Sequence, residues 1–591
     1  FGRAREGGNI VGFLRPSSPR ARATVTGLAS TVLVAGMLLG SAAGVAAKDK
    51  PGTPPGSVNI QLLAINDFHG QLPAPGGTIK VPTGPSTTTS VPLGGIVYLA
   101  QQVNALRAEN PHTLLLSAGD LIGASPLVSA LFHDEPTIEA MNQLGMNYAV
   151  VGNHEFDEGL AELYRIQNGG CNAVDGCQTG HTYAGADFPY LAANVIGTNG
   201  KPIFSPYKIA SVAGAKIGII GVVTTETPTI VMPSAIAGLT FLPEQATVNK
   251  YAAELKAKGV STIIVLLHDG TGSGPAVLNN LDATVNTCPT SMAPGNGFYD
   301  LVAGMDPVVK VVFSGHSHST YKCMVGDKIV TQASSAGRVL TDVDITVDRS
   351  TDTVTEASAH NIAVTNTGTP DPAATSLLGY YNTLVAPLAN RVVGSITADI
   401  TRTVNPAGEE ALGDVIADAQ LAATSSATTG NAVVAITNPG GIRTDLLYNQ
   451  ISGGEQLGQV TYGEAFAVQP FYNILYTETL TGAQIKGALE QQVFNSKMLQ
   501  ISKGLTYTWT VSANSGSHVT NLAINGTPVT DTGTYRVTMN NFIATGGDGF
   551  TALIGGTDLL VGSSDLDAFV AYLTANSPVA PGPQNRITVI Q

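Results

Sequence analysis

The chain has 591 residues, of which 43% are hydrophobic and only 12% are charged, and it contains 67 glycines and 33 prolines. This length predicts two to four domains, and the apolar content is enough for large cores joined by many loops. The formal net charge of −14 at pH 7 argues against a nucleic-acid-binding surface. It is compatible with an anionic substrate if metal ions or local arginines receive that substrate.

The first 47 residues differ in composition from the rest. Five arginines, from Arg3 to Arg22, precede an uncharged run over residues 23–47 that is rich in Ala, Gly, Leu and Val and ends in small residues. The pattern predicts a signal peptide over residues 1–47, cleaved near Ala47, and then a Pro/Gly linker over residues 48–57. A retained membrane anchor is the alternative, because the run is long enough to span a bilayer. We expect an exported protein, periplasmic, in the cell envelope or extracellular, without a stable transmembrane segment after cleavage.

The four cysteines are Cys171, Cys177, Cys288 and Cys323. An even number of cysteines in an exported protein predicts disulfides. We favour Cys171–Cys177, which closes a small loop, and Cys288–Cys323, although the sequence alone permits three pairings. The spacing is not Cys-x-x-Cys, which disfavours zinc-thiolate and redox roles.

Apolar, β-branched runs in the first 370 residues predict buried strands. They cover residues 58–65, 113–118, 148–151, 262–267 and 308–313, with a hairpin at 208–212 and 216–222 and a further strand at 338–347. Helices are predicted at 96–109, 126–132, 136–144 and 243–258. Residues 76–92 are expected to form a mobile surface loop, and residues 163–189 an irregular segment.

Possible metal ligands follow five of these strands. They are Asp67 and His69, Asp120, Asn153 and His154, His268, and His316 and His318. Loops at the carboxyl ends of strands usually carry the site of an α/β protein. A polar turn explains any one of these clusters, but five such coincidences are improbable. Oxygen and imidazole ligands without thiolates suit Zn, Mn or similar divalent ions.

The order Asp-x-His, Gly-Asp, Gly-Asn-His-Glu, His and Gly-His-x-His resembles that of the calcineurin-like binuclear metallophosphoesterases. The resemblance implies a four-layer β-sandwich flanked by helices, and two divalent ions. One ion would be bound by Asp67, His69, Asp120 and His318, and the other by Asp120, Asn153, His268 and His316. His154, oriented by Asp157, would contact the phosphoryl oxygens or the leaving group.

This ligand set suits phosphoester hydrolysis. Two divalent ions would polarise the phosphoryl group and lower the pKa of a water molecule, which attacks phosphorus in line. The metal ions and a protonated His154 would balance the charge on the equatorial oxygens, and Asp157 would keep His154 charged and aligned. The reaction needs no covalent phosphoenzyme.

The composition changes after residues 371–390, where residues 373–390 predict a connecting helix. Three clusters follow, at 437–443 after a strand at 432–436, at 462–473 and at 540–550. They combine glycine-rich turns with Arg443, aromatic residues and Asp548. For each cluster taken singly, a glycine turn beside core aromatics is about as good an explanation as ligand binding.

Together the three clusters resemble the carboxyl-terminal domain of secreted 5′-nucleotidases, including the bacterial 5′-nucleotidase/UDP-sugar hydrolases. The resemblance implies a metallophosphoesterase domain over residues 58–370, a linker helix over 371–390 and a smaller α/β substrate-binding domain over 391–591. Phe471 and Phe542 would sandwich the base, and Asp548 would accept the ribose hydroxyls. The implied substrate-binding residues are Arg402, Asn438, Gly441, Arg443, Phe471, Phe542 and Asp548.

The resemblance implies removal of the 5′-phosphate from nucleotides, with activity extending to nucleoside di- and triphosphates and UDP-sugars. One alternative is a 2′,3′-cyclic-nucleotide 2′-phosphodiesterase with 3′-nucleotidase activity, and a second is a secreted nucleotide-binding protein without catalysis. The chain departs from the family pattern at Arg402, which is isolated and followed by the acidic pair Glu409 and Glu410. This departure predicts phosphate binding that is weaker or organised differently.

Overall fold

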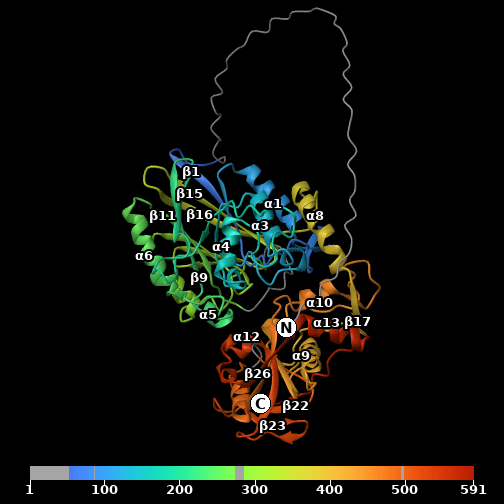
Figure 1. Cartoon of the computed structure of the whole chain (residues 1–591). Helices are drawn as coiled ribbons and strands as arrows, with labels where there is room; N and C mark the ends of the chain where they lie inside the picture. Colours follow the sequence, from blue (N-terminus) through green and yellow to red (C-terminus); the bar gives the residue numbers. More distant parts are fainter. Residues whose placement is uncertain (1–51, 85–86, 273–284, 494–497) are drawn as a thin grey trace, which may run out of the picture. The chain divides into compact units, whose positions relative to one another are not determined.

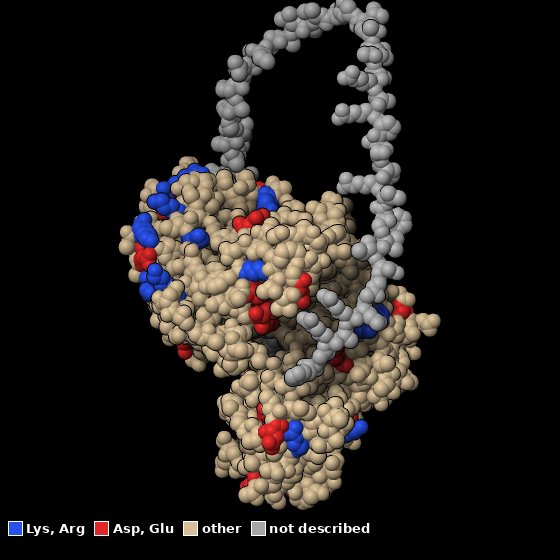
Figure 2. Space-filling model, viewed as in Figure 1, with Lys and Arg blue, Asp and Glu red and all other residues tan. Residues whose placement is uncertain are grey.

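The computed structural model describes residues 52–84, 87–272, 285–493 and 498–591 (Figure 1). The expected signal peptide and residues 48–51 of the expected linker lie outside this part of the chain. Within it, no helix combines the length and the apolar character needed to cross a membrane. Figure 2 shows that the viewed face is mostly uncharged, with acidic and basic side chains scattered in small groups.

Two six-stranded sheets form the amino-terminal part. In spatial order the first consists of β16 (Thr353–Ala363), β15 (Val339–Asp348), β1 (Ser57–Ile65), β4 (Thr113–Ser117), β5 (Tyr148–Val150) and β6 (Tyr190–Leu191). The second consists of β13 (Thr320–Val325), β14 (Lys328–Ala333), β12 (Val309–Ser314), β11 (Thr262–His268), β9 (Ala215–Val223) and β8 (Tyr207–Val212).

Helices and small strands surround these sheets. The helices are α1 (Ile96–Glu109), α2 (Leu127–Ala130), α3 (Glu135–Leu144), α4 (Leu160–Asn168), α5 (Thr227–Ile230), α6 (Glu244–Ala257), α7 (Gly297–Ala303) and α8 (Pro372–Ala389), with a 3-10 turn η1 (His154–Phe156). The small strands are β7 (Val195–Ile196) and β10 (Thr240–Phe241), which pair with each other.

The alternation of side chains along the strands builds four layers. Leu62 on β1 points into a core shared with Ile219 on β9 and Leu266 on β11, so the two sheets pack face to face. The next residue, Leu63, faces the opposite side and packs in the cluster that includes Leu99 of α1. On the second sheet, α6 and α7 pack on the outer face through a separate apolar cluster. The predicted α/β sandwich flanked by helices is confirmed.

Parallel pairing brings the ligand-bearing strand ends to common sheet edges. β1 pairs in parallel with β4, and β4 with β5. In the second sheet β9, β11 and β12 are also parallel. Each of these strands is buried on both faces, which explains why the sequence shows continuous apolar runs rather than alternation.

The carboxyl-terminal part has its own sheets and apolar core. A five-stranded sheet consists of β21 (Gln500–Ile501), β18 (Val434–Thr437), β25 (Thr534–Asn540), β20 (Ile474–Thr481) and β26 (Thr557–Ser564). A four-stranded sheet consists of β24 (Thr527–Pro528), β23 (Val519–Ile524), β22 (Leu505–Thr510) and β27 (Ile587–Ile590), and β17 (Val392–Ser395) pairs with β19 (Gln459–Thr461). The helices are α9 (Ala411–Thr424), α10 (Tyr462–Val468), α11 (Gly482–Glu490), α12 (Asn541–Ala544) and α13 (Asp565–Asn576), with 3-10 turns η2 (Pro439–Gly441), η3 (Gly547–Gly549) and η4 (Thr551–Leu553).

Two sequence predictions are corrected by the structure. Residues 76–92 do not form a loop but a hairpin, β2 (Thr78–Gly84) and β3 (Thr87–Pro92), whose Ile79 and Val91 are buried. Its β-branched residues favour extended structure despite the Pro and Gly content. The segment predicted as irregular begins with helix α4, because Leu163 and Ile166 pack into the main core. Both expected disulfides, Cys171–Cys177 and Cys288–Cys323, are confirmed.

Candidate active site

The backbone is strained at the predicted ligand loops. Asp67, His69, Asp120, His316 and His318 all take positive φ, between 48° and 68°. Such values are uncommon for residues other than glycine. They persist where surrounding structure enforces them, and they cluster at functional sites. The predicted ligands therefore coincide with local strain at three separate strand ends.

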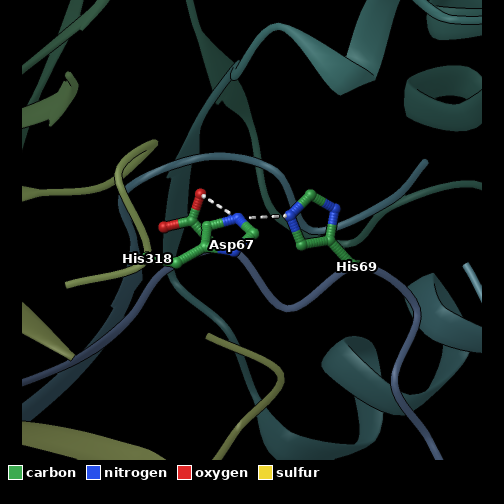
Figure 3. A group of neighbouring side chains, drawn as sticks. All are labelled: Asp67, His69 and His318. Atoms are coloured by element: carbon green, nitrogen blue, oxygen red, sulfur yellow. Dashed lines mark hydrogen bonds and ion pairs between the residues drawn. The ribbon is translucent and has the colours of Figure 1, made fainter. Parts of the chain in front are cut away.

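Asp67, His69 and His318 form a first cluster, in which one nitrogen of each imidazole points toward the other ring (Figure 3). Nδ1 of His69 lies 2.9 Å from the carbonyl oxygen of Gly123, and this contact directs Nε2 of His69 to within 3.0 Å of Nε2 of His318. Nε2 of His318 also lies 3.5 Å from Oδ1 of Asp67. A proton held on Nδ1 by a carbonyl leaves Nε2 with a free lone pair, as in histidines that bind metals.

Asp120, His268 and His316 form a second cluster. Oδ1 of Asn153 lies 3.0 Å from Nε2 of His268 and 3.0 Å from Nδ1 of His316. Nδ1 of His268 contacts the Ala118 carbonyl at 2.9 Å, so Nε2 again faces inward. Oδ2 of Asp120 lies 3.2 Å from Nε2 of His268 and 3.8 Å from Nε2 of His69. Asp120 thus lies between the two clusters.

The electrostatics of the first cluster favour a cation. Burial raises the pKa of Asp67 to about 6 and lowers the pKa of His69 to about 3. Both shifts have the same cause, since a low-dielectric surrounding disfavours the charged form of either group. A divalent ion would offset the buried carboxylate charge and use the neutral imidazoles. Oxygen and nitrogen donors in two clusters that meet at Asp120 fit a pair of such ions.

His154 lies beside these clusters and is oriented by a carboxylate. Its Nδ1 is 2.7 Å from Oδ2 of Asp157, and its backbone N–H donates to Oδ1 of Asp120 at 2.9 Å. Burial opposes the protonated ring, but Asp157 and Asp120 outweigh it and raise the pKa of His154. The ring also stacks on Phe471, with centroids 5.8 Å apart and planes 11° apart. A cationic imidazole is therefore favoured next to the candidate metal ligands.

Glu155 is a site residue that the sequence analysis missed. Its carboxylate is buried and accepts hydrogen bonds from the backbone N–H groups of Asp120 (3.0 Å), Leu121 (2.8 Å) and Gly152. Gly152 is required at that point, because a Cβ there would lie 2.1 Å from Oδ1 of Asp120. The Gly-Asn-His-Glu motif contained the signal, but only the fold shows that this carboxylate joins two ligand loops.

Residues from both predicted sets line one cavity of about 400 Å³, whereas Asp67, His69 and His268 are not part of its lining. From the candidate metal clusters and their surroundings it includes Asp120, Asn153, His154, Asp157, His316 and His318, and from the carboxyl-terminal part Asn438, Gly441, Arg443, Phe471, Phe542 and Asp548. Ile230, Val231 and Met232 add an apolar wall that the sequence analysis did not identify.

The carboxyl-terminal residues of this cavity hold each other in place. Nδ2 of Asn438 donates to Oδ2 of Asp548 at 2.7 Å, and Oδ1 of Asn438 accepts from Asn540 at 3.0 Å. Gly547 lets the ring of Phe542 pack closely, since a Cβ at Gly547 would lie 2.6 Å from that ring. The ring of Phe542 and the Asp548 carboxylate thus have defined positions before any ligand binds.

Arg402 is the predicted substrate-binding residue that does not line this cavity. Its Nε donates to Oδ1 of Asp445 at 3.1 Å, and it lines a neighbouring cavity of about 790 Å³ that it shares with Arg443. Glu409, one of the acidic residues that follow Arg402, accepts hydrogen bonds from the backbone N–H groups of Arg586 and Ile587. Its carboxylate therefore satisfies buried backbone donors.

Two family profiles match the chain. The calcineurin-like phosphoesterase profile covers residues 60–320, and the profile of the 5′-nucleotidase C-terminal domain covers residues 392–554. The chain is 33% identical to the cell wall protein Lmo0130 of Listeria monocytogenes, over 92% of this chain and 70% of that protein. It is 31% identical to the endonuclease YhcR of Bacillus subtilis over 92% of this chain, but spans only 42% of that protein.

A solved structure shares the fold over most of the chain. The 5′-nucleotidase precursor from Thermus thermophilus superposes with a TM-score of 0.71 and 26% identity, covering 90% of this chain and 99% of that one. Fold and site together define a metallophosphoesterase. The chain belongs to the family of phosphoester hydrolases that join a calcineurin-like phosphoesterase domain to a 5′-nucleotidase carboxyl-terminal domain. The resemblance drawn from the motifs is confirmed.

Proposed function

We propose that this protein removes the 5′-phosphate of nucleotides in a metal-dependent hydrolysis, with activity extending to UDP-sugars and nucleoside di- and triphosphates. One observation carries the proposal. A single cavity brings residues of the strained carboxylate–imidazole clusters together with two aromatic rings and an acidic side chain suited to a nucleoside. The family and the Thermus structure support the same activity.

In this proposal two divalent ions, Zn, Mn or similar, would occupy the two clusters. Asp67, His69 and His318 would hold one ion and Asn153, His268 and His316 the other, with Asp120 as the carboxylate that lies between the clusters. When bound, the ions supply positive charge for the phosphoryl group and lower the pKa of water. Glu155 keeps the two ligand loops in register through the backbone amides that it accepts from.

The remaining residues bind and orient the nucleotide. Phe471 and Phe542 stack the base from its two faces, which is worth roughly 1–3 kcal/mol per base and tolerates any base. The carboxylate of Asp548, which Asn438 holds in place, accepts hydrogen bonds from the ribose hydroxyls. The guanidinium of Arg443, 5.7 Å from the centroid of Phe471, lies beside the base site and takes the phosphate.

His154 is the proposed acid. The contact with Asp157 favours the protonated form of His154. The protonated ring stabilises negative charge on the phosphoryl oxygens, or donates its proton to the leaving group as the ester bond breaks. Arg402 lies in the adjoining cavity, where it would contact phosphates beyond the one that is cleaved. This placement supports activity on longer phosphate chains.

We also propose the domain limits and the location. Residues 58–370 would form the phosphoesterase domain, 371–390 the linker and 391–591 the substrate-binding domain, because α8 separates the two matched profiles. Export is supported by the arginine-rich leader pattern, the disulfides and the cell wall name of the Listeria relative.

The test is phosphate release from AMP, 3′-AMP, 2′,3′-cyclic AMP, UDP-glucose and ATP, with and without EDTA and added Mn²⁺ or Zn²⁺. We expect EDTA-sensitive release from AMP, weak activity on the 3′ and cyclic substrates, and no turnover by Asp120→Ala. Preference for the 3′ or cyclic substrates would establish the phosphodiesterase alternative. Saturable nucleotide binding without turnover in any metal would establish a binding protein.

A further inference from the structure

A second group of potential metal ligands lies outside the active-site clusters and shares no residue with them. His133 follows helix α2, Glu158 precedes helix α4 and Glu162 lies in its first turn. One ligand atom from each of these three residues lies within 4.8 Å of the other two. None of these residues lines the nucleotide cavity, and the proposed reaction makes no use of them.

The imidazole of His133 is held by a carboxylate on each side. Its Nε2 lies 3.0 Å from Oδ2 of Asp175, and its Nδ1 lies 2.7 Å from Oε2 of Glu158. When a histidine binds a metal through one nitrogen, the other nitrogen usually donates its hydrogen to a carboxylate or carbonyl. Asp175 is in position to accept that hydrogen, which leaves the lone pair of Nδ1 facing Glu158 and Glu162.

The third ligand is fixed by its neighbours. Oε1 of Glu162 accepts hydrogen bonds from Arg165, at 2.9 Å from Nε and 2.6 Å from Nη2, and Oε2 lies 3.3 Å from Nδ2 of Asn172. Asn172 and Asp175 both belong to the short loop closed by the Cys171–Cys177 disulfide. The side chain of Glu162 is 14% exposed and that of His133 is 18% exposed, so two of the ligands are largely withdrawn from solvent.

The charge around His133 is strongly negative. Glu158, Glu162 and Asp175 surround one imidazole, and Arg165, the nearby cation, is shared between Glu162 and Glu135. A divalent cation would neutralise this excess better than a single proton. The same pattern, imidazole nitrogens facing carboxylates, characterises the candidate active-site clusters of this chain.

We propose that His133, Glu158 and Glu162 form a third, peripheral binding site for a divalent cation of the Zn²⁺ type, with Asp175 orienting the imidazole. The nitrogen and carboxylate donors suit borderline cations such as Zn²⁺ better than Ca²⁺ or Mg²⁺, which prefer oxygen ligands alone. An ion there joins the disulfide loop to the segment that continues from Asp157, the carboxylate that contacts His154.

The experiment measures zinc per chain by mass spectrometry of the metal, after chelator treatment, reloading with ZnCl₂ and desalting of the full chain. We expect His133→Ala to hold one ion fewer than the wild type, with the turnover of AMP in saturating Mn²⁺ retained. The matched control is His181→Ala, an exposed histidine 3.6 Å from Glu139, which should keep the wild-type content. Asp175→Asn should keep the site but weaken zinc binding by about 10- to 100-fold.

A second pair of variants distinguishes the third ion from the active-site ions. Asp120→Ala should lose its active-site ions and still bind one zinc, and adding His133→Ala should remove that ion. Equal zinc content in the wild type and His133→Ala, or equal loss in His181→Ala, would overturn the proposal. If circular dichroism shows that His133→Ala is unfolded, Glu162→Gln replaces it and must show the same loss of one ion.

Discussion

The buried carboxylate of Glu155 shows how one side chain can set the geometry of a whole site. It accepts backbone hydrogen bonds from the loop that carries Asp120 and from Gly152 just after β5. Neither loop has regular structure at that point, so the carboxylate substitutes for the missing backbone pairing. The position of Asp120 between the clusters thus depends on a residue that does not line the cavity.

Glu155→Gln tests this role. A glutamine has a single acceptor oxygen, so at least one of the three backbone N–H groups loses its partner while buried. We expect a loss of about 1–3 kcal/mol in the free energy of unfolding, together with weaker retention of the active-site metal. Urea denaturation and metal content measure the two effects. Glu254→Gln, on the exposed face of α6, is the matched control, and a Glu155→Gln protein with wild-type values for both would refute the role.

Phe542 carries a separate prediction about substrate binding. Phe542→Ala removes one face of the base sandwich and should raise KM for AMP by about 5- to 150-fold, the equivalent of roughly 1–3 kcal/mol of stacking. KM for p-nitrophenyl phosphate should change little, because that substrate has no base to stack. Steady-state kinetics with both substrates provide the comparison. Equal changes for the two substrates would argue against the sandwich.

At the scale of elements, the start of helix α9 carries the acidic pair Glu409 and Glu410, which departs from the family pattern. Glu410 precedes the helix, and its backbone N–H donates to Oε1 of Gln500 at 2.7 Å. Within the described part of the chain its Oε2 is buried without a hydrogen-bond partner. Burial, opposed by Arg402 and assisted by Asp445, raises the pKa of Glu410 to about 7.

This shift predicts a pH dependence of stability. Between about pH 4.5 and pH 7 the folded protein retains a proton that the unfolded chain releases, so the free energy of unfolding falls as the pH rises. Glu410→Gln removes that contribution. The free energy of unfolding of the variant, measured relative to that of the wild type, should therefore increase by on the order of 1–3 kcal/mol as the pH rises from 5 to 8.

Urea denaturation at pH 5 and pH 8 checks the prediction. Glu356→Gln, at an exposed position of β16, serves as the control and should follow the wild type at both values. A constant difference between Glu410→Gln and the wild type across this range would mean that Glu410 is ionised in the folded protein throughout.

At the scale of the whole molecule, the candidate metal clusters connect strand ends from both sheets. Asp67 and Asp120 follow strands of the first sheet, whereas His268 and His316 come from the second. Ions bound there would link the two halves of the sandwich at the edge where apolar packing ends. Metal binding should therefore stabilise the fold as well as the reaction.

Chelation provides the measurement. At metal concentrations 100- to 1,000-fold above Kd, binding contributes about 3–4 kcal/mol, so EDTA should lower Tm by several degrees. Adding Mn²⁺ or Zn²⁺ should restore Tm. Asp120→Ala should start from the lower Tm and respond little to EDTA. An unchanged Tm on complete chelation, verified by metal analysis, would show that the ions do not brace the two sheets.

Much of the amino-terminal fold could be predicted because its signals are local. An apolar β-branched run followed by Gly, Asp or His is visible within ten residues, and strands β1, β4, β5 and β11 form where those runs lie. The hairpin β2–β3 was missed because its Pro, Gly and Thr content outweighs its short apolar pattern. Burial of Val91 and of Ile79, which belongs to an apolar cluster with Val339 and Ala363, decides its structure.

The sequence by itself determined the family, the α/β class and the residue types of the candidate site, since motif order and strand-end chemistry are properties of short segments. Only the tertiary structure decided which groups meet. It placed Asp120 between two clusters, directed Glu155 to backbone amides, left Arg402 in an adjoining cavity and gathered His133 with Glu158 and Glu162. These outcomes depend on strand register and on packing between distant segments, which no local pattern encodes.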